Sequence, residues 1–393
     1  MQVFAILRDH PGLRHILLAL LGAVVAAAVL AGASEFRATQ LSSVAYLATA
    51  AAGLTILTGL NGQLSLGHGA FMAIGAYTAA LMLQDAEPVA PLPLVLLSAA
   101  VVATVAGFVV GLAAARLSGP YLAGATLALA VAVPGLAIFF GETLGGEQGL
   151  SIRVPDAPDW FADTLYLLTA VDPSRGRYIA FVSWVVLIVV LVLLANLAAS
   201  RVGRTWRAVR DDEIAAQLAG IDVARSRITA FTVSAACAGI AGGVMALVVR
   251  IAAPSGFTLT LSMTLVAAIV IGGLGTLTGA LIGAGLLTFL PQLATDAGGN
   301  LGFDDVQSAQ LAPLVYGLVM MLVVLLSPGG LVGLARRAPR PWRRAPATPP
   351  ETPSGPTDPP SAEESDLPKS DQHKSDQHKD QGTTRTTIER DPA

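Results

Sequence analysis

Ten long apolar runs constrain the fold of this 393-residue chain more than any other feature. They occur near residues 16–33, 41–60, 70–84, 92–115, 120–141, 178–199, 228–249, 261–274, 277–292 and 311–327. A helix needs about 20 apolar residues to cross a bilayer, and most of the runs approach that length. Hydrophobic residues make up 53% of the chain and charged residues only 13%, unlike a soluble protein. The sequence therefore predicts an all-α, polytopic transmembrane helix bundle of about ten helices with broken or re-entrant segments.

A glycine-rich polar stretch, TGLNGQLSLGHGAFMAIGAY at 58–77, interrupts the apolar pattern. Lipid offers no hydrogen-bonding groups, so irregular backbone inside a bilayer persists only where protein buries it or water reaches it. Its side chains that can hydrogen-bond include Asn61, Gln63, Ser65 and His68. We interpret these four residues as candidates for a substrate pathway. The alternative is a short cytoplasmic turn, because Asn and Gly are also the commonest turn-forming residues.

A second glycine-rich interruption lies at 272–279, where Gly272, Gly273 and Gly275 separate two short apolar runs. Interrupted segments in two parts of a transporter point to its pathway, so we expect both breaks near a central conduit. Small residues also allow helices to pack closely, which is the alternative explanation for the second break.

Arginine placement predicts the orientation, because cytoplasmic loops of membrane proteins collect basic residues. With the amino terminus in the cytoplasm, fourteen arginines fall inside, concentrated at 200–227 and 336–344, and five fall outside. The outer five are Arg37, Arg153, Arg175, Arg177 and Arg250. We expect both termini in the cytoplasm and residues 143–177 on the outside.

Residues 1–40 hold an amino-terminal segment and the first apolar run. Arg8 and Arg14 before the run and small residues at 31–33 resemble a signal peptide. The apolar region of about 18 residues exceeds the core of a typical signal, so we expect a retained membrane helix.

Beyond Trp342 the composition changes to Pro, Ser, Thr, Asp, Glu, Lys and Gln, with a direct repeat of Ser-Asp-Gln-His-Lys. Such a segment cannot bury a core. Residues 336–393 are therefore expected to form a cytoplasmic basic stretch and a disordered acidic tail. His373 and His378 fit a duplicated linker as well as a metal site, and we assign them no chemistry.

The sequence contains none of the motifs of nucleotide hydrolysis or metal catalysis. Its lysines, Lys369, Lys374 and Lys379, all lie in the tail, so no P-loop lysine is available. Ion-coupled transporters bury ionisable groups near the bilayer midplane, and here only His68 and the borderline Glu142 qualify. We expect a transport subunit and not an enzyme, with no metal or cofactor of its own and with a partner that supplies energy.

The loop at 200–227 is the candidate attachment site for that partner. Asp212, or the residue before it, can cap a short helix, and Gly220 can end it. Ile214 and Leu218 then share one face, as a helix-in-groove contact requires. The alternative is a surface helix that rests on the protein's own bundle.

Seven motifs occur in an order that resembles one transporter family. They are GQLSLGHGAF at 62–71, GAYTAAL at 75–81, GPYLAGATLALA at 119–130, TLGGEQGL at 143–150, RAVRDDEIAAQLAGID at 207–222, VIGGLGTLTGALIGA at 270–284 and SPGGLVGL at 327–334. Together they resemble the inner-membrane permeases of branched-chain amino-acid ATP-binding-cassette (ABC) importers, of the LivM type, over residues 41–334.

This resemblance implies a permease domain at 41–335 and a multi-pass protein of the bacterial cytoplasmic membrane, in contact with lipid. The implied partners are a second, similar permease, two cytoplasmic ATPases that use ATP and Mg²⁺, and an extracytoplasmic substrate-binding protein. No nucleic-acid partner is implied.

The coupling loop of ABC-importer permeases carries Glu-Ala-Ala, three residues and then Gly. Ala215, Ala216 and Gly220 keep this spacing, whereas Glu213 stands one position early and Ile214 occupies the acidic position. The residues implied in ATPase coupling are Asp212, Glu213, Ile214, Ala215, Ala216, Leu218 and Gly220.

The implied substrate is a branched-chain or other hydrophobic amino acid, selected by the binding protein. An uncharged pathway suits a small zwitterion or a neutral solute, so import of urea or a short amide is the alternative within the class. An autonomous channel or ion-coupled secondary transporter is the alternative outside it.

Overall fold

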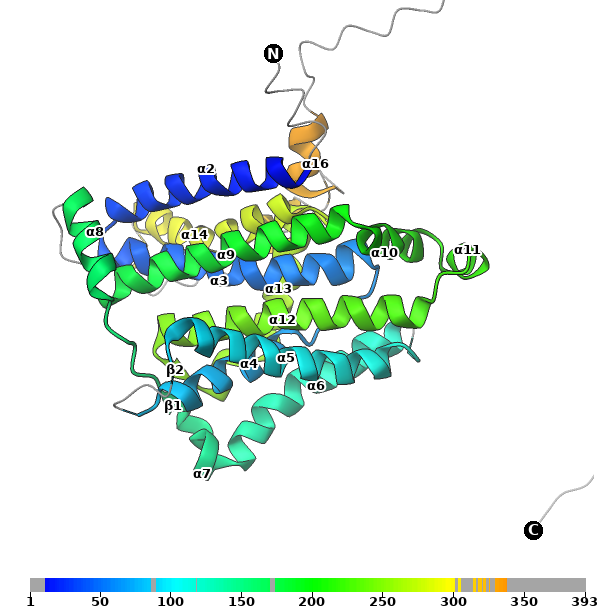
Figure 1. The fold of residues 1–393 in the computed structure, drawn as a ribbon, viewed down its shortest axis with the longest axis horizontal. Helices are drawn as coiled ribbons and strands as arrows, with labels where there is room; N and C mark the ends of the chain where they lie inside the picture. Colours follow the sequence, from blue (N-terminus) through cyan, green and yellow to red (C-terminus); the bar gives the residue numbers. More distant parts are fainter. Residues whose placement is uncertain are drawn as a thin grey trace, which may run out of the picture. The chain divides into compact units, whose positions relative to one another are not determined.

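The described chain is built from α-helices, with one antiparallel pairing of two short strands, β1 (Leu150–Ser151) and β2 (Ile251–Ala252) (Figure 1). The computed structural model describes residues 11–85, 90–117, 119–169, 174–300, 303–304, 314–315, 317–319, 321–322, 325 and 329–337. The helix expected at 311–327 is covered only in part, and the tail beyond residue 337 lies outside the described residues.

Among the described residues, seven helical segments are long and apolar enough to cross a membrane. They are α3 (Glu35–Leu54) with the π-helix η1 (Thr55–Leu60), α5 (Leu92–Ala114), α6 (Pro120–Phe139), α9 (Arg175–Ala199), α12 (Val223–Val249), α13 (Leu259–Gly272) with the 3-10 helix η3 (Pro254–Phe257), and α14 (Leu277–Asn300). Two further apolar helices are α2 (Pro11–Ala31) and α4 (His68–Leu83). The expected all-α polytopic bundle is confirmed.

Helix α12 occupies the centre of the bundle and packs against α3, α4 and α5. Glycines allow this packing to be close. A Cβ on Gly242 would lie 1.9 Å from the carbonyl oxygen of Met72 on α4, and a Cβ on Gly75 would lie 2.0 Å from the carbonyl oxygen of Gly239. Helices α4 and α12 therefore meet at backbone contact, as small residues permit between membrane helices.

The outer helices complete the bundle. Helix α2 packs along α9, α14 packs against α3 and α13, and α6 packs against α4. Their outward surfaces expose large apolar side chains such as Leu20 on α2, Leu193 on α9 and Val131 on α6. Lipid tails are as apolar as leucine, so exposing these side chains to a bilayer carries no penalty.

The two ends of the bundle carry different elements. At one end, called here the α10–α11 end, lie α10 (Arg201–Asp211), α11 (Glu213–Leu218) and the start of α12. The opposite end carries β1, β2, α7 (Gly141–Leu144), the 3-10 helix η2 (Gly146–Gln148) and α8 (Asp159–Thr169). Helix α16 (Gly330–Arg337) packs against α13 and α14.

Candidate functional site

The first glycine-rich break is an extended segment that re-enters the bundle. Helix α3 closes in the π-helix η1, residues 61–67 are not helical, and α4 starts at His68. Asn61 bonds to Ser226 of α12, and His68 bonds to Ser234 of the same helix. Eight residues of α-helix rise about 12 Å, so the segment runs about that far along α12. The segment therefore extends further along α12 and into the bundle than a short surface turn would.

Side chains along the segment alternate in exposure, as expected for extended chain. Asn61, Gln63 and Ser65 are buried, whereas Gly62 and Leu64 are exposed. Asn61, Gln63 and Ser65 therefore face the chain's own interior, and the opposite side of the segment is exposed.

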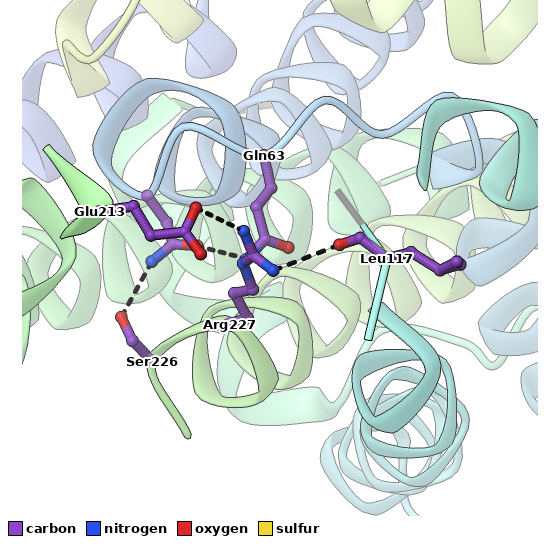
Figure 2. A network of polar contacts seen from close by, with 6 residues as sticks. Gln63, Leu117, Glu213, Ser226 and Arg227 are labelled. Carbon is purple, nitrogen blue, oxygen red and sulfur yellow. Dashed lines mark hydrogen bonds and ion pairs between the residues drawn. The ribbon is translucent and has the colours of Figure 1, made fainter. Parts of the chain in front are cut away.

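Hydrogen bonds hold the buried amides at the start of the segment. Gln63 Nε2 donates to Asn61 Oδ1 at 2.7 Å, and Asn61 Nδ2 donates to Ser226 Oγ at 3.1 Å (Figure 2). Gln63 Oε1 is buried without a partner among the described residues. The two amides and the serine therefore link the segment to the first turn of α12.

His68 makes the corresponding link deeper in the bundle. Ser234 Oγ donates to the carbonyl oxygen of Gly53 at 2.7 Å and lies 2.7 Å from His68 Nε2. Because a hydroxyl has one proton, His68 donates from Nε2. In the neutral imidazole Nδ1 is then the acceptor and lies 3.4 Å from Ser65 Oγ. Contact between substrate and these four residues stays a prediction, since the isolated chain buries them all.

The backbone of the segment is only partly paired. The amide of Leu66 bonds to Thr126 on α6, and the amide of Gly69 bonds to Ser262 on α13. Within the described residues, the amides of Leu64 and Ser65 make no hydrogen bond. Irregular backbone is not stable against lipid, so the exposed side of residues 62–66 must meet protein or water.

The second break packs directly on the first. Helix α13 ends at Gly272, and Gly273 and Gly275 adopt positive φ angles before α14 begins. A Cβ on Gly59 would lie 2.4 Å from the amide nitrogen of Gly275. The close packing offered as the alternative for this break is therefore present, and it lies beside the first break. A conduit role for Gly272, Gly273 and Gly275 stays a prediction.

The loop at 200–227 folds as two helices joined at Asp212. Its carboxylate accepts from the amide of Ala215 at 3.0 Å and caps α11. Gly220 has a φ of 82° after the helix, a conformation that favours glycine. The cap and the glycine lie where the sequence indicates.

The two faces of α11 have opposite environments. Ala216 is buried against Val209 and Val223. On the outside, Ile214 is 71% exposed and Leu218 is 85% exposed. The helix rests on its own bundle through one face and leaves the apolar pair free on the other.

Two arginines connect this loop to the rest of the bundle. Arg227 donates to Glu213 Oε2 at 2.8 Å and to the carbonyl oxygen of Leu117 at 3.3 Å (Figure 2). Arg210 donates to the carbonyl oxygen of Gly59 at 2.7 Å. From the sequence alone both arginines indicate only the orientation, because charge bias accounts equally well for every arginine of the loop.

A cavity of about 210 Å³ separates the first break from α11. Its lining residues are Asn61, Gly62, Gln63, Val209, Arg210, Asp211, Asp212, Glu213 and Arg227. The structure thus brings two of the four polar residues predicted for the pathway, Asn61 and Gln63, next to two of the predicted coupling residues, Asp212 and Glu213.

The apolar helices, the buried broken segment and the exposed short helix fit a polytopic membrane transport protein. The sequence matches the permease component of the branched-chain amino acid transport system over residues 36–324, and the chain belongs to this family. This finding confirms the resemblance drawn from the motifs.

Three relatives illustrate the match. The LivM permease protein of the high-affinity branched-chain amino acid transport system of Salmonella typhimurium is 32% identical over 300 residues, covering 72% of this chain and 67% of that protein. LivM of Escherichia coli is 31% identical over 304 residues, with the same two coverages. The probable branched-chain amino acid transport permease protein LivH of Methanocaldococcus jannaschii is 28% identical over 300 residues, covering 72% and 87%. No solved structure matches the chain.

Proposed function

We propose that this chain is the membrane-spanning subunit of an ABC importer for branched-chain or other hydrophobic amino acids. The observation that carries the proposal is the exposed pair Ile214 and Leu218 on α11. Burying an aliphatic side chain contributes about 1.5–3 kcal/mol, so a partner that covers both gains a substantial free energy. Ile214 and Leu218 form an i, i+4 apolar pair on one exposed face of a short helix, which supports a protein groove as the site for α11.

The proposed assembly contains two ATPases, a second permease and an extracytoplasmic binding protein. In Salmonella typhimurium, both LivM and LivH are named as permease proteins of the high-affinity branched-chain amino acid transport system, and this chain is similar to both. That similarity supports a second permease of the same fold. The exposed side of residues 62–66 would face that permease or the aqueous path between the two.

The proposed location is the bacterial cytoplasmic membrane, with both termini and the α10–α11 end in the cytoplasm. The arginines of α10 support this orientation. Helix α11 then lies on the side where ATP is available.

Uptake by cells tests the substrate class. A strain that lacks the gene should lose uptake of radiolabelled leucine, isoleucine and valine, and a plasmid copy of the chain should restore it. Loss of urea or acetamide uptake, with amino-acid uptake unchanged, would instead identify the alternative importer. Uptake that persists after deletion of the ATPases encoded beside the gene would identify an autonomous transporter.

A further inference from the structure

We infer that Arg227 and Arg210 form two polar connections through which displacement of α11 and α10 reaches the first break, the former at residues 61–67 and the latter at Gly59. This inference rests on the proposed function, because it names the residues that link the ATPase-binding helix to the membrane-embedded break. It gives both arginines a role as positioning residues.

Arg227 joins three elements at the α10–α11 end. Its guanidinium binds Glu213 in the first turn of α11 and the carbonyl oxygen of Leu117, just beyond α5. Arg227 itself belongs to α12, and its side chain is only 12% exposed. An arginine offers several donors in a rigid plane, so one side chain holds both acceptors in a fixed arrangement.

The connection continues through the neighbouring residue of α12. Ser226 accepts from Asn61 at 3.1 Å, and Asn61 accepts from Gln63 at 2.7 Å. Figure 2 shows the ion pair with Gln63 close by, and both amides line the same cavity as Glu213 and Arg227. A movement of α11 that pulls on Glu213 therefore acts on the turn of α12 to which the irregular segment is bonded.

Arg210 supplies a second, separate connection. It lies in the last turn of α10 and donates to the carbonyl oxygen of Gly59, near the end of η1. Gly59 in turn contacts Gly275 of the second break. Movement of α10 therefore acts on both breaks together.

The chain contains a matched comparison for Arg227 in the same turn of α12. Arg225 pairs with Asp222, and its side chain is 86% exposed. This pair joins neighbouring residues of one helix start and, within the part of the chain that the structure describes, reaches no other element. Exposed pairs of this kind contribute little to stability, so Arg225 controls for the loss of a positive charge at this site.

The experiment uses the complete complex, purified through a tag on this chain and placed in proteoliposomes. The quantity measured is the number of leucine molecules transported per ATP hydrolysed. Arg227→Gln should lower this ratio about tenfold while the recovery of the ATPases stays unchanged. Glu213→Gln should act in the same direction. The double variant should be no worse than Arg227→Gln, because both changes break the same Arg227–Glu213 ion pair. Arg225→Gln should leave the ratio unchanged.

A ratio for Arg227→Gln equal to that of the unaltered complex would overturn the inference, as would an equal loss in Arg225→Gln. If Arg227→Gln does not assemble, the unaltered complex supplies the test by amide hydrogen exchange. Addition of ATP should change the amide exchange rates of residues 61–67 together with those of α11. Unchanged exchange rates in residues 61–67 would overturn the inference. Failure of the unaltered chain to retain any ATPase would instead contradict the proposed function itself.

Discussion

Gly59 and Gly275 are in backbone contact, since a Cβ on Gly59 would lie 2.4 Å from the amide nitrogen and 2.5 Å from the Cα of Gly275. The contact joins two irregular segments that are far apart in the sequence and places both beside Arg210. The glycines at the two breaks therefore have a packing role in addition to any role in a pathway.

Gly59→Ala tests this packing. The added methyl group has no room against Gly275, and overpacking of this kind costs about 1–3 kcal/mol. We expect a lower midpoint of thermal unfolding for the detergent-solubilised chain. Gly285→Ala is the matched control, because a Cβ there meets no atom of the described residues within 4 Å. Equal midpoints for the two variants would show that the contact is not tight.

Asn61→Ala and Gln63→Ala test the buried amides. Removing Asn61 leaves Gln63 without its acceptor, and an unsatisfied buried group costs about 1–3 kcal/mol. We expect impaired uptake of leucine with normal assembly of the complex. Thr264→Ala is the control, because among the described residues that hydroxyl bonds only to the carbonyl oxygen of Thr260 in its own helix. Full uptake in both amide variants would remove these residues from the pathway.

Leu218→Asp tests the apolar face of α11. Loss of one buried aliphatic contact and desolvation of a carboxylate should weaken ATPase binding at least tenfold, about 1.4 kcal/mol. Ala224→Asp is the control: it adds the same charge at an exposed position in the first turn of α12, where an acidic residue is favourable. Recovery of the ATPases in pull-down measures the difference. Undiminished recovery with Leu218→Asp, together with undiminished substrate-stimulated ATP hydrolysis, would exclude α11 as the coupling helix.

Cysteine labelling of intact cells tests the orientation. The single native cysteine, Cys237, is buried, and Cys237→Ala provides a background without thiols. An impermeant maleimide should label a cysteine introduced at Asp159 and should not label one introduced at Arg207 until the cells are opened. The reverse pattern would invert the topology.

The sequence predicted the helices well because membrane-spanning runs are set by local hydropathy. The cap at Asp212 and the left-handed Gly220 were likewise local and lie as expected. Glycine and polar residues between apolar runs also predict the first break. The sequence does not predict how far this segment extends into the bundle, because that depends on the distant partners Ser226 and Ser234 on α12.

The hydrogen bonds made by Arg210 and Arg227 could not be predicted from the sequence for a similar reason. Their acceptors include the backbone carbonyls of Gly59 and Leu117, and a carbonyl acceptor carries no residue-type signal. The contact of Gly59 with Gly275 cannot be predicted from the sequence either. A glycine that packs tightly against another segment and a glycine that only turns the chain are the same residue type.

The most direct test is leucine uptake by proteoliposomes that contain the complex purified through this chain, with ATP inside and the binding protein outside. Uptake should require ATP, the ATPases and the binding protein, and excess isoleucine or valine should compete with leucine. Uptake that proceeds without the ATPases, or that follows an ion gradient instead of ATP, would contradict an importer powered through α11.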